Sequence, residues 1–459
     1  MLSIDHPIQL SSLIPIIERM FEVSGRKIAG IQKAWNPAKG SPVFTVDGKY
    51  TSRGWTEWTQ GFQFGSAVLQ YEVTGEKEFL TVGRDGTLRE MPRHVSHVGV
   101  HDHGFNTIST CGNLLRLIRE KKIPHDEWEK NFYELAIKVS GAVQAARWTD
   151  LGGNQGYIYS FNGPHSLFAD TIRSLRVLAV AHQLGHVLMG EQDRRINLLE
   201  RLLQHAETTA RFNVYFGEGR DSYDVRGRVA HESIFNTNDG SYRCASTQQG
   251  YSPFSTWTRG LAWILLGYAE ELEFLSTLPA DELATFGGRE RILGAFQTVA
   301  RAAADFYINN TSIDGIPYWD TGAPGLSKLG NYLDRPADPF NEYEPVDSSA
   351  AAIAAQGLVR LGNFLLTVGE KGSGEKYLQA GLAVASRVFQ EPYLSIDPNH
   401  EGLILHSVYH RPNGWDHIPS GKKIPCGEAT MWGDYHAREL GLLTLRMAKN
   451  ESYYTFFLK

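Results

Sequence analysis

The feature that most constrains this chain is an alternation of long and short connections between amphipathic helices. Apolar residues recur at steps of three and four, as at Trp128, Phe132, Leu135, Val139 and Val143, which places one apolar stripe on a helix. Strand-like alternation is rare by comparison, so the sequence predicts an all-α protein. About twelve helices are expected, near residues 9–23, 55–73, 77–89, 104–120, 126–146, 167–184, 190–212, 255–276, 288–309, 346–368, 375–390 and 426–447.

The connections after the first, third, fifth, seventh, ninth and eleventh helices are long, whereas the others are short turns. Short connections join antiparallel neighbours. All six long loops therefore emerge at one end of the molecule if the helices run up and down in order, which describes an α/α toroid with a functional rim. The long connections are residues 24–54, 90–103, 147–166, 213–254, 310–345 and 391–425.

Loop 213–254 is expected to contain a small β-hairpin, because Thr237-Asn238-Asp239-Gly240 is a turn signal between His231–Asn236 and Ser241–Ala245. A helical-repeat scaffold that binds proteins is the alternative architecture. Long loops rich in Trp, His, Gly and Pro favour a pocket instead.

Length and composition narrow the class of protein further. The 459 residues would suggest two or three domains, but no composition break or Pro/Ser-rich linker divides them, so one domain over residues 1–459 is expected. The net charge is −6 without a run of five basic residues, which argues against nucleic-acid binding. Residues 1–15 lack a signal-peptide pattern and no stretch approaches eighteen apolar residues, so we expect a cytoplasmic protein without membrane contact.

Several kinds of chemistry lack support in the sequence. There is no GxSxG, GxxxxGK[ST], HExxH or GxGxxG motif, so neither a serine nucleophile nor a nucleotide site is indicated. Cys111, Cys244 and Cys426 lie too far apart for a metal knuckle or a disulfide framework. His97 and His101 are four residues apart, but Gly99 and alternating valines favour a loop. Pocket lining is therefore favoured over metal binding, and no metal or cofactor is predicted.

Two aspartates stand out by their placement at the predicted rim. Asp102 ends a long loop at the start of the fourth helix, and Asp170 lies in the first turn of the sixth. Each could simply satisfy free N–H groups at a helix N-terminus. Two carboxylates at one aromatic-rich rim make a functional pair an equal alternative, in which mutual repulsion and apolar neighbours raise one pKa so that one acid stays protonated near neutral pH.

A third cluster combines Gln248-Gln249-Gly250-Tyr251 with Trp257-Thr258-Arg259-Gly260-Leu261-Ala262-Trp263. Arg259 and Trp263 share one face of a helix. Indole rings cover the C–H face of a sugar and a guanidinium clamps a carboxylate, so a uronic acid would fit this group; core tryptophans beside a surface arginine are the alternative. Further aromatic residues at the same end, Trp55, Trp58, Tyr318 and Trp319, favour a carbohydrate pocket.

With these motifs in place, the sequence resembles the unsaturated glucuronyl hydrolases of glycoside hydrolase family 88. The matching stretches extend through most of the chain. They are Trp58-Thr59-Gln60-Gly61-Phe62, His101-Asp102-His103-Gly104-Phe105, Asp170 within its apolar helix start, Gln249-Gly250-Tyr251, Trp257 to Trp263, Asp314-Gly315-Ile316-Pro317-Tyr318-Trp319-Asp320, Glu344 to Ala351, Leu405-His406-Ser407-Val408-Tyr409-His410, and Trp432-Gly433-Asp434-Tyr435.

The resemblance implies an (α/α)6 barrel and assigns roles to individual residues. Asp170 would be the general acid and base, with Asp102 as its essential partner. The uronate subsite would be lined by Trp58, His101, His231, Gln249, Trp257, Arg259, Trp263 and His406. His410 could fill the place of His406 equally well. An aromatic residue that is usually Trp in the family corresponds to Phe161 here.

The implied reaction is removal of a 4,5-unsaturated uronic acid from the non-reducing end of oligosaccharides left by polysaccharide lyases, through hydration of a vinyl ether. Asp170 would protonate C4 and then act as base on the water that adds at C5. The expected partner is that oligosaccharide, and a monomer or weak homo-oligomer is expected. An unsaturated rhamnogalacturonyl hydrolase, a saturated uronidase, a sugar epimerase and a non-catalytic sugar-binding protein are the alternatives.

Overall fold

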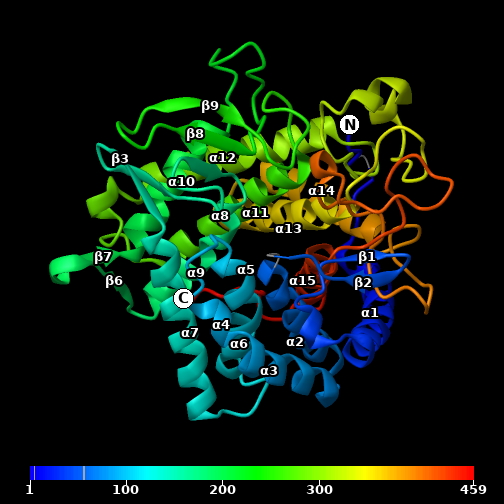
Figure 1. The fold of residues 1–459 in the computed structure, drawn as a ribbon, viewed down its shortest axis with the longest axis horizontal. Helices are drawn as coiled ribbons and strands as arrows, with labels where there is room; N and C mark the ends of the chain where they lie inside the picture. The colour runs from blue at the N-terminus through cyan, green and yellow to red at the C-terminus, as the bar shows by residue number, and fades with distance from the viewer. Residues whose placement is uncertain (5, 55–56, 459) are drawn as a thin grey trace.

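The computed structural model describes residues 1–4, 6–54 and 57–458, and is mostly helical, with 54% of residues in helices (Figure 1). Trp55 therefore lies outside the described residues. The α-helices are α1 (Ile14–Ala34), α2 (Gln60–Thr74), α3 (Lys77–Glu90), α4 (Pro92–Val95), α5 (His103–Thr107), α6 (Asn113–Arg119), α7 (Glu127–Ala146), α8 (Thr171–Ser174), α9 (Arg176–Gln183), α10 (Leu198–Asn213), α11 (Thr258–Thr277), α12 (Arg289–Asn310), α13 (Ser348–Thr367), α14 (Lys371–Val388) and α15 (Met431–Ala448).

Short antiparallel strands occupy the loops between these helices. Two-stranded hairpins form between β1 and β2, β3 and β4, and β6 and β7, and a three-stranded sheet has the order β5-β8-β9. The predicted hairpin in loop 213–254 is confirmed as β8 and β9, and the structure adds β5 beside it. The strands are β1 (Phe44–Val46), β2 (Lys49–Thr51), β3 (Trp148–Gly152), β4 (Gln155–Ile158), β5 (Ser166–Phe168), β6 (Val187–Met189), β7 (Arg195–Asn197), β8 (Glu232–Phe235) and β9 (Tyr242–Ser246).

Two of the expected helical segments begin as β-structure. The segment 167–184 starts as strand β5 and becomes helical only from Thr171. The segment 190–212 starts as the β6–β7 hairpin, and α10 begins at Leu198, where the Asn197 side chain accepts a hydrogen bond from Leu199 N at 2.8 Å. An asparagine N-cap of this kind satisfies a free N–H group at a helix start, which explains where the helix can begin.

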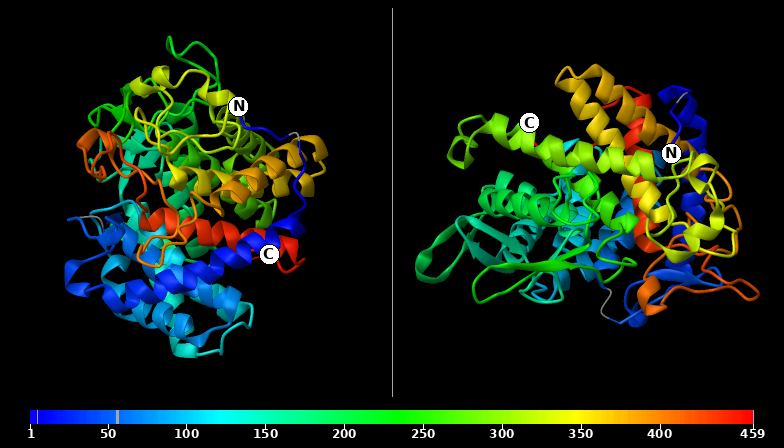
Figure 2. Two further views of the ribbon diagram at one scale, coloured as in Figure 1. Left: turned by 90° about the vertical axis from the view of Figure 1, so that its right-hand side faces the viewer. Right: turned by 90° about the horizontal axis from the view of Figure 1, so that it is seen from above.

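The helices pack as an inner and an outer set. Along the inner set, α2 packs on α15, α15 on α13, α13 on α11, α11 on α8, α8 on α5, and α5 again on α2. On the outside, α3 packs on α2, α7 on α9, α12 on α11 and α14 on α13. Figure 2 shows the paired helices α13 and α14 from two further sides. The long loops with their β-hairpins join the ends of these helices and position the site.

Helix α7 does not bury the face that carries the predicted apolar stripe. Trp128 and Leu135, from its apolar stripe, are 66% and 60% exposed. The buried face instead carries Tyr133 and Ile137 together with small residues. Among the small residues is Gly141, where an added Cβ would lie 2.7 Å from Ala181 Cβ and 3.2 Å from Val177 O of α9. Small side chains let two helices approach closely, so Gly141 brings α7 close to α9.

Helix α13 forms the centre of the core. Its most apolar window has a mean hydropathy of 1.3, so by length and composition the helix could cross a membrane, but 83% of that window is buried inside the molecule. Buried helices of folded domains have this composition. The helix starts at Asp347, whose Oδ1 accepts from Ser349 N and Ala350 N, and Asp347 also reaches the site described below.

Candidate active site

A cavity of about 130 Å³ opens where the long loops converge. Its walls come from the start of α2, the segment before α5, the segment before α8, the loop and first turns of α11, and the loop before α15. The rim that the loop alternation predicted is therefore where the cavity lies. Eight of the predicted residues line it: Trp58, His101, Asp102, Asp170, Gln249, Trp257, Arg259 and Trp263.

The two aspartates do not serve as helix caps. Asp102 and Asp170 occupy the N-cap positions of α5 and α8, yet neither side chain makes a capping hydrogen bond. His101 Nε2 lies 3.5 Å from Asp102 Oδ1 and 3.8 Å from Asp170 Oδ1, and the ligand-type atoms of these three side chains all lie within 4.8 Å of one another. The capping alternative is wrong, and the carboxylates form a pair around one imidazole.

A glycine brings the two aspartate-bearing segments together. An added Cβ on Gly104 would lie 2.1 Å from Ser174 O, so a larger residue there would separate α5 from α8. Gly104 N donates to Ser174 Oγ at 2.8 Å, and Gly104 O accepts from Arg176 Nε at 3.0 Å. This close packing holds the start of α5, which follows Asp102, against α8, which follows Asp170.

Burial and mutual charge give the three groups different pKa directions. Burial alone would lower the pKa of His101, but Asp102 and Asp170 outweigh it and the pKa is raised. Burial, together with repulsion from Asp170, raises the pKa of Asp102. Burial would also raise the pKa of Asp170, but His101 outweighs it and the pKa is lowered. One pKa of the pair is raised, as predicted, and it belongs to Asp102 in the ligand-free protein.

Several buried polar atoms around the cavity have no hydrogen-bond partner among the described residues. They include both ring nitrogens of His101, Asp170 Oδ1 and His231 Nε2. Burying such groups without a partner costs free energy. His101 and Asp170 line the cavity, so a polar ligand bound there would complete their hydrogen bonds.

His231 has a defined tautomer. Its Nδ1 accepts from Gln248 N at 3.0 Å and Gln249 N at 3.3 Å, so the neutral ring carries its proton on Nε2. Burial lowers the pKa of His231 to about 4, which keeps the ring neutral. His231 is not among the residues that line the cavity; it packs behind the wall against Phe168 and Trp257, with ring centroids 4.5 and 4.7 Å away.

Arg259 lines the cavity, but its donors are already occupied. Nη1 donates to Asp347 Oδ2 at 3.0 Å and to Val408 O, and Nη2 donates to Gln249 Oε1 at 2.9 Å and to Tyr409 O at 2.7 Å. A guanidinium has four Nη hydrogens, and all four are used. The predicted bidentate clamp on a substrate carboxylate is therefore not available in this arrangement, and Arg259 holds the cavity wall together.

His406 and His410 have different surroundings. His406 has a φ of +66°, and its ring Nδ1 accepts from Gly427 N at 3.0 Å; the ring packs beside Phe340 and Tyr393. His410 lines the cavity, whereas His406 is not among the lining residues. The role of His406 in the uronate subsite stays a prediction, and the geometry favours His410.

Sequence reasoning left other cavity residues outside the site. Tyr409, Asn413 and Trp415 line it together with His410. A signal for them was present, since Tyr409 lies within a matching stretch and Arg411-Pro412-Asn413-Gly414 is a turn pattern followed by a tryptophan. Phe161, 42% exposed, stacks beside His101 with ring centroids 6.3 Å apart and so occupies the expected aromatic position.

The histidine-rich run before α5 does not converge on one point. His94 contacts Gln60 and Asn106, and burial lowers its pKa to about 3. His103 contacts His97 O at 3.0 Å, while His101 alone reaches the cavity. These histidine side chains therefore contact different parts of the fold. The sequence predicted a loop around Gly99, and residues 96–102 lie outside the helices and strands.

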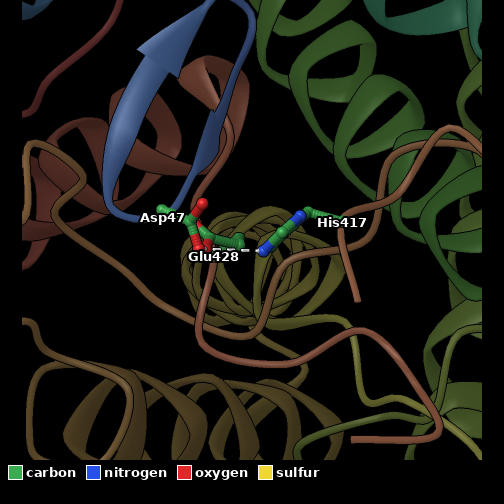
Figure 3. Close-up of side chains that lie close together, drawn as sticks. All are labelled: Asp47, His417 and Glu428. Atoms are coloured by element: carbon green, nitrogen blue, oxygen red, sulfur yellow. Dashed lines mark ion pairs between the residues drawn. The ribbon is translucent and has the colours of Figure 1, made fainter. Parts of the chain in front are cut away.

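A second histidine and carboxylate group lies outside the cavity. His417 Nε2 is 3.2 Å from Asp47 Oδ1, and Glu428 lies beside them (Figure 3). Asp47 belongs to the β1–β2 turn, whereas His417 and Glu428 belong to the loop before α15. The ion pair joins this turn to the loop that carries Tyr409, His410 and Trp415.

Comparison with known proteins supports the motif-based reading. No family model matches the chain. It is 26% identical over 401 residues to the unsaturated glucuronyl hydrolase of Bacillus sp. strain GL1, covering 85% of this chain and 87% of the relative. It is 24% identical over 386 residues to that of Formosa agariphila, covering 83% and 78%, and 24% identical over 409 residues to the unsaturated chondroitin disaccharide hydrolase of Streptococcus pyogenes, covering 86% and 83%.

Solved structures show the same fold. An unsaturated glucuronyl hydrolase specific for heparin aligns with a TM-score of 0.70 at 20% identity, covering 95% of this chain and 98% of the other. The glycosaminoglycan-degrading enzyme from Bacillus sp. GL1 aligns with a TM-score of 0.68 at 22% identity, covering 95% and 97%. By sequence the chain is similar to unsaturated glucuronyl hydrolases, as its motifs predicted, and it shares the fold of their solved structures.

Proposed function

We propose that this protein is a glycosidase that removes 4,5-unsaturated glucuronic acid from the non-reducing end of glycosaminoglycan oligosaccharides. The observation that carries the proposal is the buried group of His101, Asp102 and Asp170, whose polar atoms face a cavity lined by tryptophans. The relatives act, by their names, on unsaturated glucuronyl and chondroitin substrates. Aromatic walls with a few convergent polar groups are typical of sugar sites.

We propose an (α/α)6 barrel as the scaffold. The contacts that lead from α2 through α15, α13, α11, α8 and α5 back to α2 support a closed inner ring. The outer helices α3, α7, α12 and α14 each pack on an inner partner. A barrel of this kind places six long loops at one end, where the cavity lies.

The proposed reaction is hydration of the C4–C5 double bond. Asp170 donates a proton to C4, positive charge develops at C5 and the ring oxygen, and water adds at C5 while Asp170 takes a proton from it. The resulting hemiketal opens by breaking the bond between C5 and the ring oxygen. C1 is then a hemiacetal, which expels the second sugar.

Asp170 must be protonated before the first step, although its pKa is lowered in the ligand-free protein. The carboxylate of the substrate brings a negative charge into the cavity and displaces water, and both effects raise the pKa of a neighbouring carboxyl. Asp102 and His101 are the adjacent groups that share the proton with Asp170. Substrate binding thus prepares the acid that the reaction requires.

The test is a panel of unsaturated disaccharides from glycosaminoglycans, gellan, xanthan and rhamnogalacturonan, followed by the ultraviolet absorbance of the conjugated double bond. Hydration removes this absorbance and splits the substrate. Release of the second sugar with the absorbance retained would contradict the hydration mechanism. Preferred cleavage of the rhamnogalacturonan disaccharide would show that the enzyme is specific for an unsaturated galacturonyl group, and not for a glucuronyl group.

A further inference from the structure

A histidine and two carboxylates from distant parts of the chain meet outside the catalytic cavity. Asp47 lies in the turn between β1 and β2, while His417 and Glu428 lie in the loop before α15. One ligand-type atom from each of the three side chains lies within 4.8 Å of the other two. Figure 3 shows the imidazole of His417 directed toward the two carboxylates. One imidazole nitrogen with two carboxylate oxygens is a donor set that binds zinc in proteins.

The contact between His417 and Asp47 is not a hydrogen bond. His417 Nε2 lies 3.2 Å from Asp47 Oδ1, but this nitrogen is buried and has no hydrogen-bond partner among the described residues. Two ligand atoms at roughly 2.0–2.1 Å from one tetrahedral zinc ion lie about 3.3–3.4 Å apart. The two side chains therefore have nearly the spacing of two ligands of one ion, and an ion would give the buried nitrogen the partner that it lacks.

Glu428 is held in position through one of its two carboxylate oxygens. Its Oε2 accepts from Thr45 Oγ1 at 2.5 Å and from Gly48 N at 3.3 Å, whereas no hydrogen bond among the described residues reaches its Oε1. A small void of about 10 Å³ is lined by Glu428, His417 and Asp416, among others. A void of this size holds roughly one water-sized particle. The carboxylate thus has a fixed position and one oxygen left for a ligand beside a space that an ion can fill.

His400 also lies beside Glu428, but it is not available as a ligand. Its Nε2 is 3.6 Å from Glu428 Oε2. Its Nδ1 accepts from Gly402 N at 3.0 Å, so the neutral ring carries its proton on Nε2, which donates to Gly427 O at 3.1 Å. Both nitrogens of His400 therefore have protein partners, in contrast to the buried nitrogen of His417.

We propose that Asp47, His417 and Glu428 bind one zinc ion, with water completing its coordination. The imidazole ligand favours zinc over Ca²⁺ and Mg²⁺, which take oxygen ligands. The Asp47 side chain is 83% exposed, so the site opens to solvent and exchanges its ion. The ion joins the β1–β2 turn to the loop that carries Tyr409 and His410 of the cavity wall. None of the three ligands lines the catalytic cavity, so the inference is independent of the proposed function.

The experiment measures binding of Zn²⁺ alone to the full chain by calorimetry, after treatment with a chelator. The wild type should bind one Zn²⁺ per chain at this site, and Asp47→Asn should weaken its affinity by about 10-fold or more, because one of three protein ligands loses its charge. Asparagine tolerates the φ of +49° at this position, so the variant should fold. At a hundredfold excess of Zn²⁺ over its Kd, the Tm of the wild type should rise by about 2–5 °C, and that of Asp47→Asn should rise less.

Asp193→Asn is the matched control, because Asp193 is another exposed aspartate at a positive φ, of +57°, and lies outside this group. It should leave the affinity for Zn²⁺ unchanged. Asp170→Asn alters the histidine and carboxylate group of the catalytic cavity and should also leave this binding unchanged. Absence of Zn²⁺ binding to the wild type, or equal affinity in the wild type and Asp47→Asn, would overturn the inference. So would a loss of binding in Asp170→Asn alone, which would place the ion in the catalytic cavity.

Discussion

Arg259 lines the catalytic cavity, and Arg411 lines a separate hollow. The two arginines differ in what surrounds their donors. Arg259 is 2% exposed, and its four Nη hydrogens go to Asp347, Gln249 and two backbone carbonyls. Arg411 has no such acceptors among the described residues. An arginine beside tryptophans can therefore stabilise the fold or bind a ligand. The hydrogen-bond acceptors around its guanidinium decide which of these roles it has.

We expect every catalytic residue to lie in the cavity that Asp170 lines. The substitution Asp170→Asn tests this expectation and has the largest predicted effect. Removing a general acid and base lowers turnover by about 10²- to 10⁴-fold. The fold should persist, because the Asp170 side chain makes no capping hydrogen bond. Loss of absorbance at saturating substrate measures kcat, and thermal unfolding serves as the control. A variant that keeps more than a tenth of wild-type kcat would exclude Asp170 as the acid.

The contrast between the two arginines predicts opposite effects on stability. Arg259→Met leaves Asp347, which is fully buried, without its cation, and breaking such a buried pair costs about 3–5 kcal/mol. Arg411→Gln removes no hydrogen bond or ion pair to the described residues and should change the free energy of unfolding by less than about 0.5 kcal/mol. Urea unfolding measures both. Equal destabilisation by the two substitutions would remove the basis of the comparison.

The charge state of the inner cavity can be followed through His101. Its pKa is raised above the usual 6.5, so the attraction to the aspartates is complete below pH 6.5 and is lost as the pH rises through the folded-state value. The attraction to Asp102 is the largest single contribution that raises this pKa. In Asp102→Asn the pKa of His101 should therefore fall, as measured by titration of the ring resonances in NMR spectra. An unchanged midpoint would show that Asp102 does not control this imidazole.

The smallest predicted effects separate the two histidines of the loop before α15. His410→Asn should raise KM several-fold without affecting stability, since His410 lines the cavity. His406→Asn should leave KM unchanged and lower the free energy of unfolding by about 1 kcal/mol, because the hydrogen bond from Gly427 N is lost. Steady-state kinetics and denaturant titration of both variants test this. A KM effect confined to the His406 variant would support the original assignment.

Much of the fold was accessible from local patterns. Helical periodicity and the lengths of the connections identified the helices and the end at which the loops gather, because both depend on neighbours in the sequence. The stripe on α7 was misplaced because burial is decided by the opposing surface: α9 approaches closely at Gly141, on a face that Trp128 and Leu135 do not share. The single domain over 1–459, the cytoplasmic location and the oligomeric state stay predictions.

For the site, the sequence by itself determined which residues could carry the chemistry. Asp102 and Asp170 were identified from their places at helix starts, and Trp58, Trp257 and Trp263 from the aromatic residues expected at the same end of the helices, because these signals are local in the chain. Only the tertiary structure decided which donors and acceptors already have partners. The Nη donors of Arg259 are occupied by protein acceptors, and His406 has a positive φ. Arg411, in contrast, lines an open hollow. The physical reason is that hydrogen-bond partners come from segments more than a hundred residues apart, as with Arg259 and Val408, and no local pattern records them.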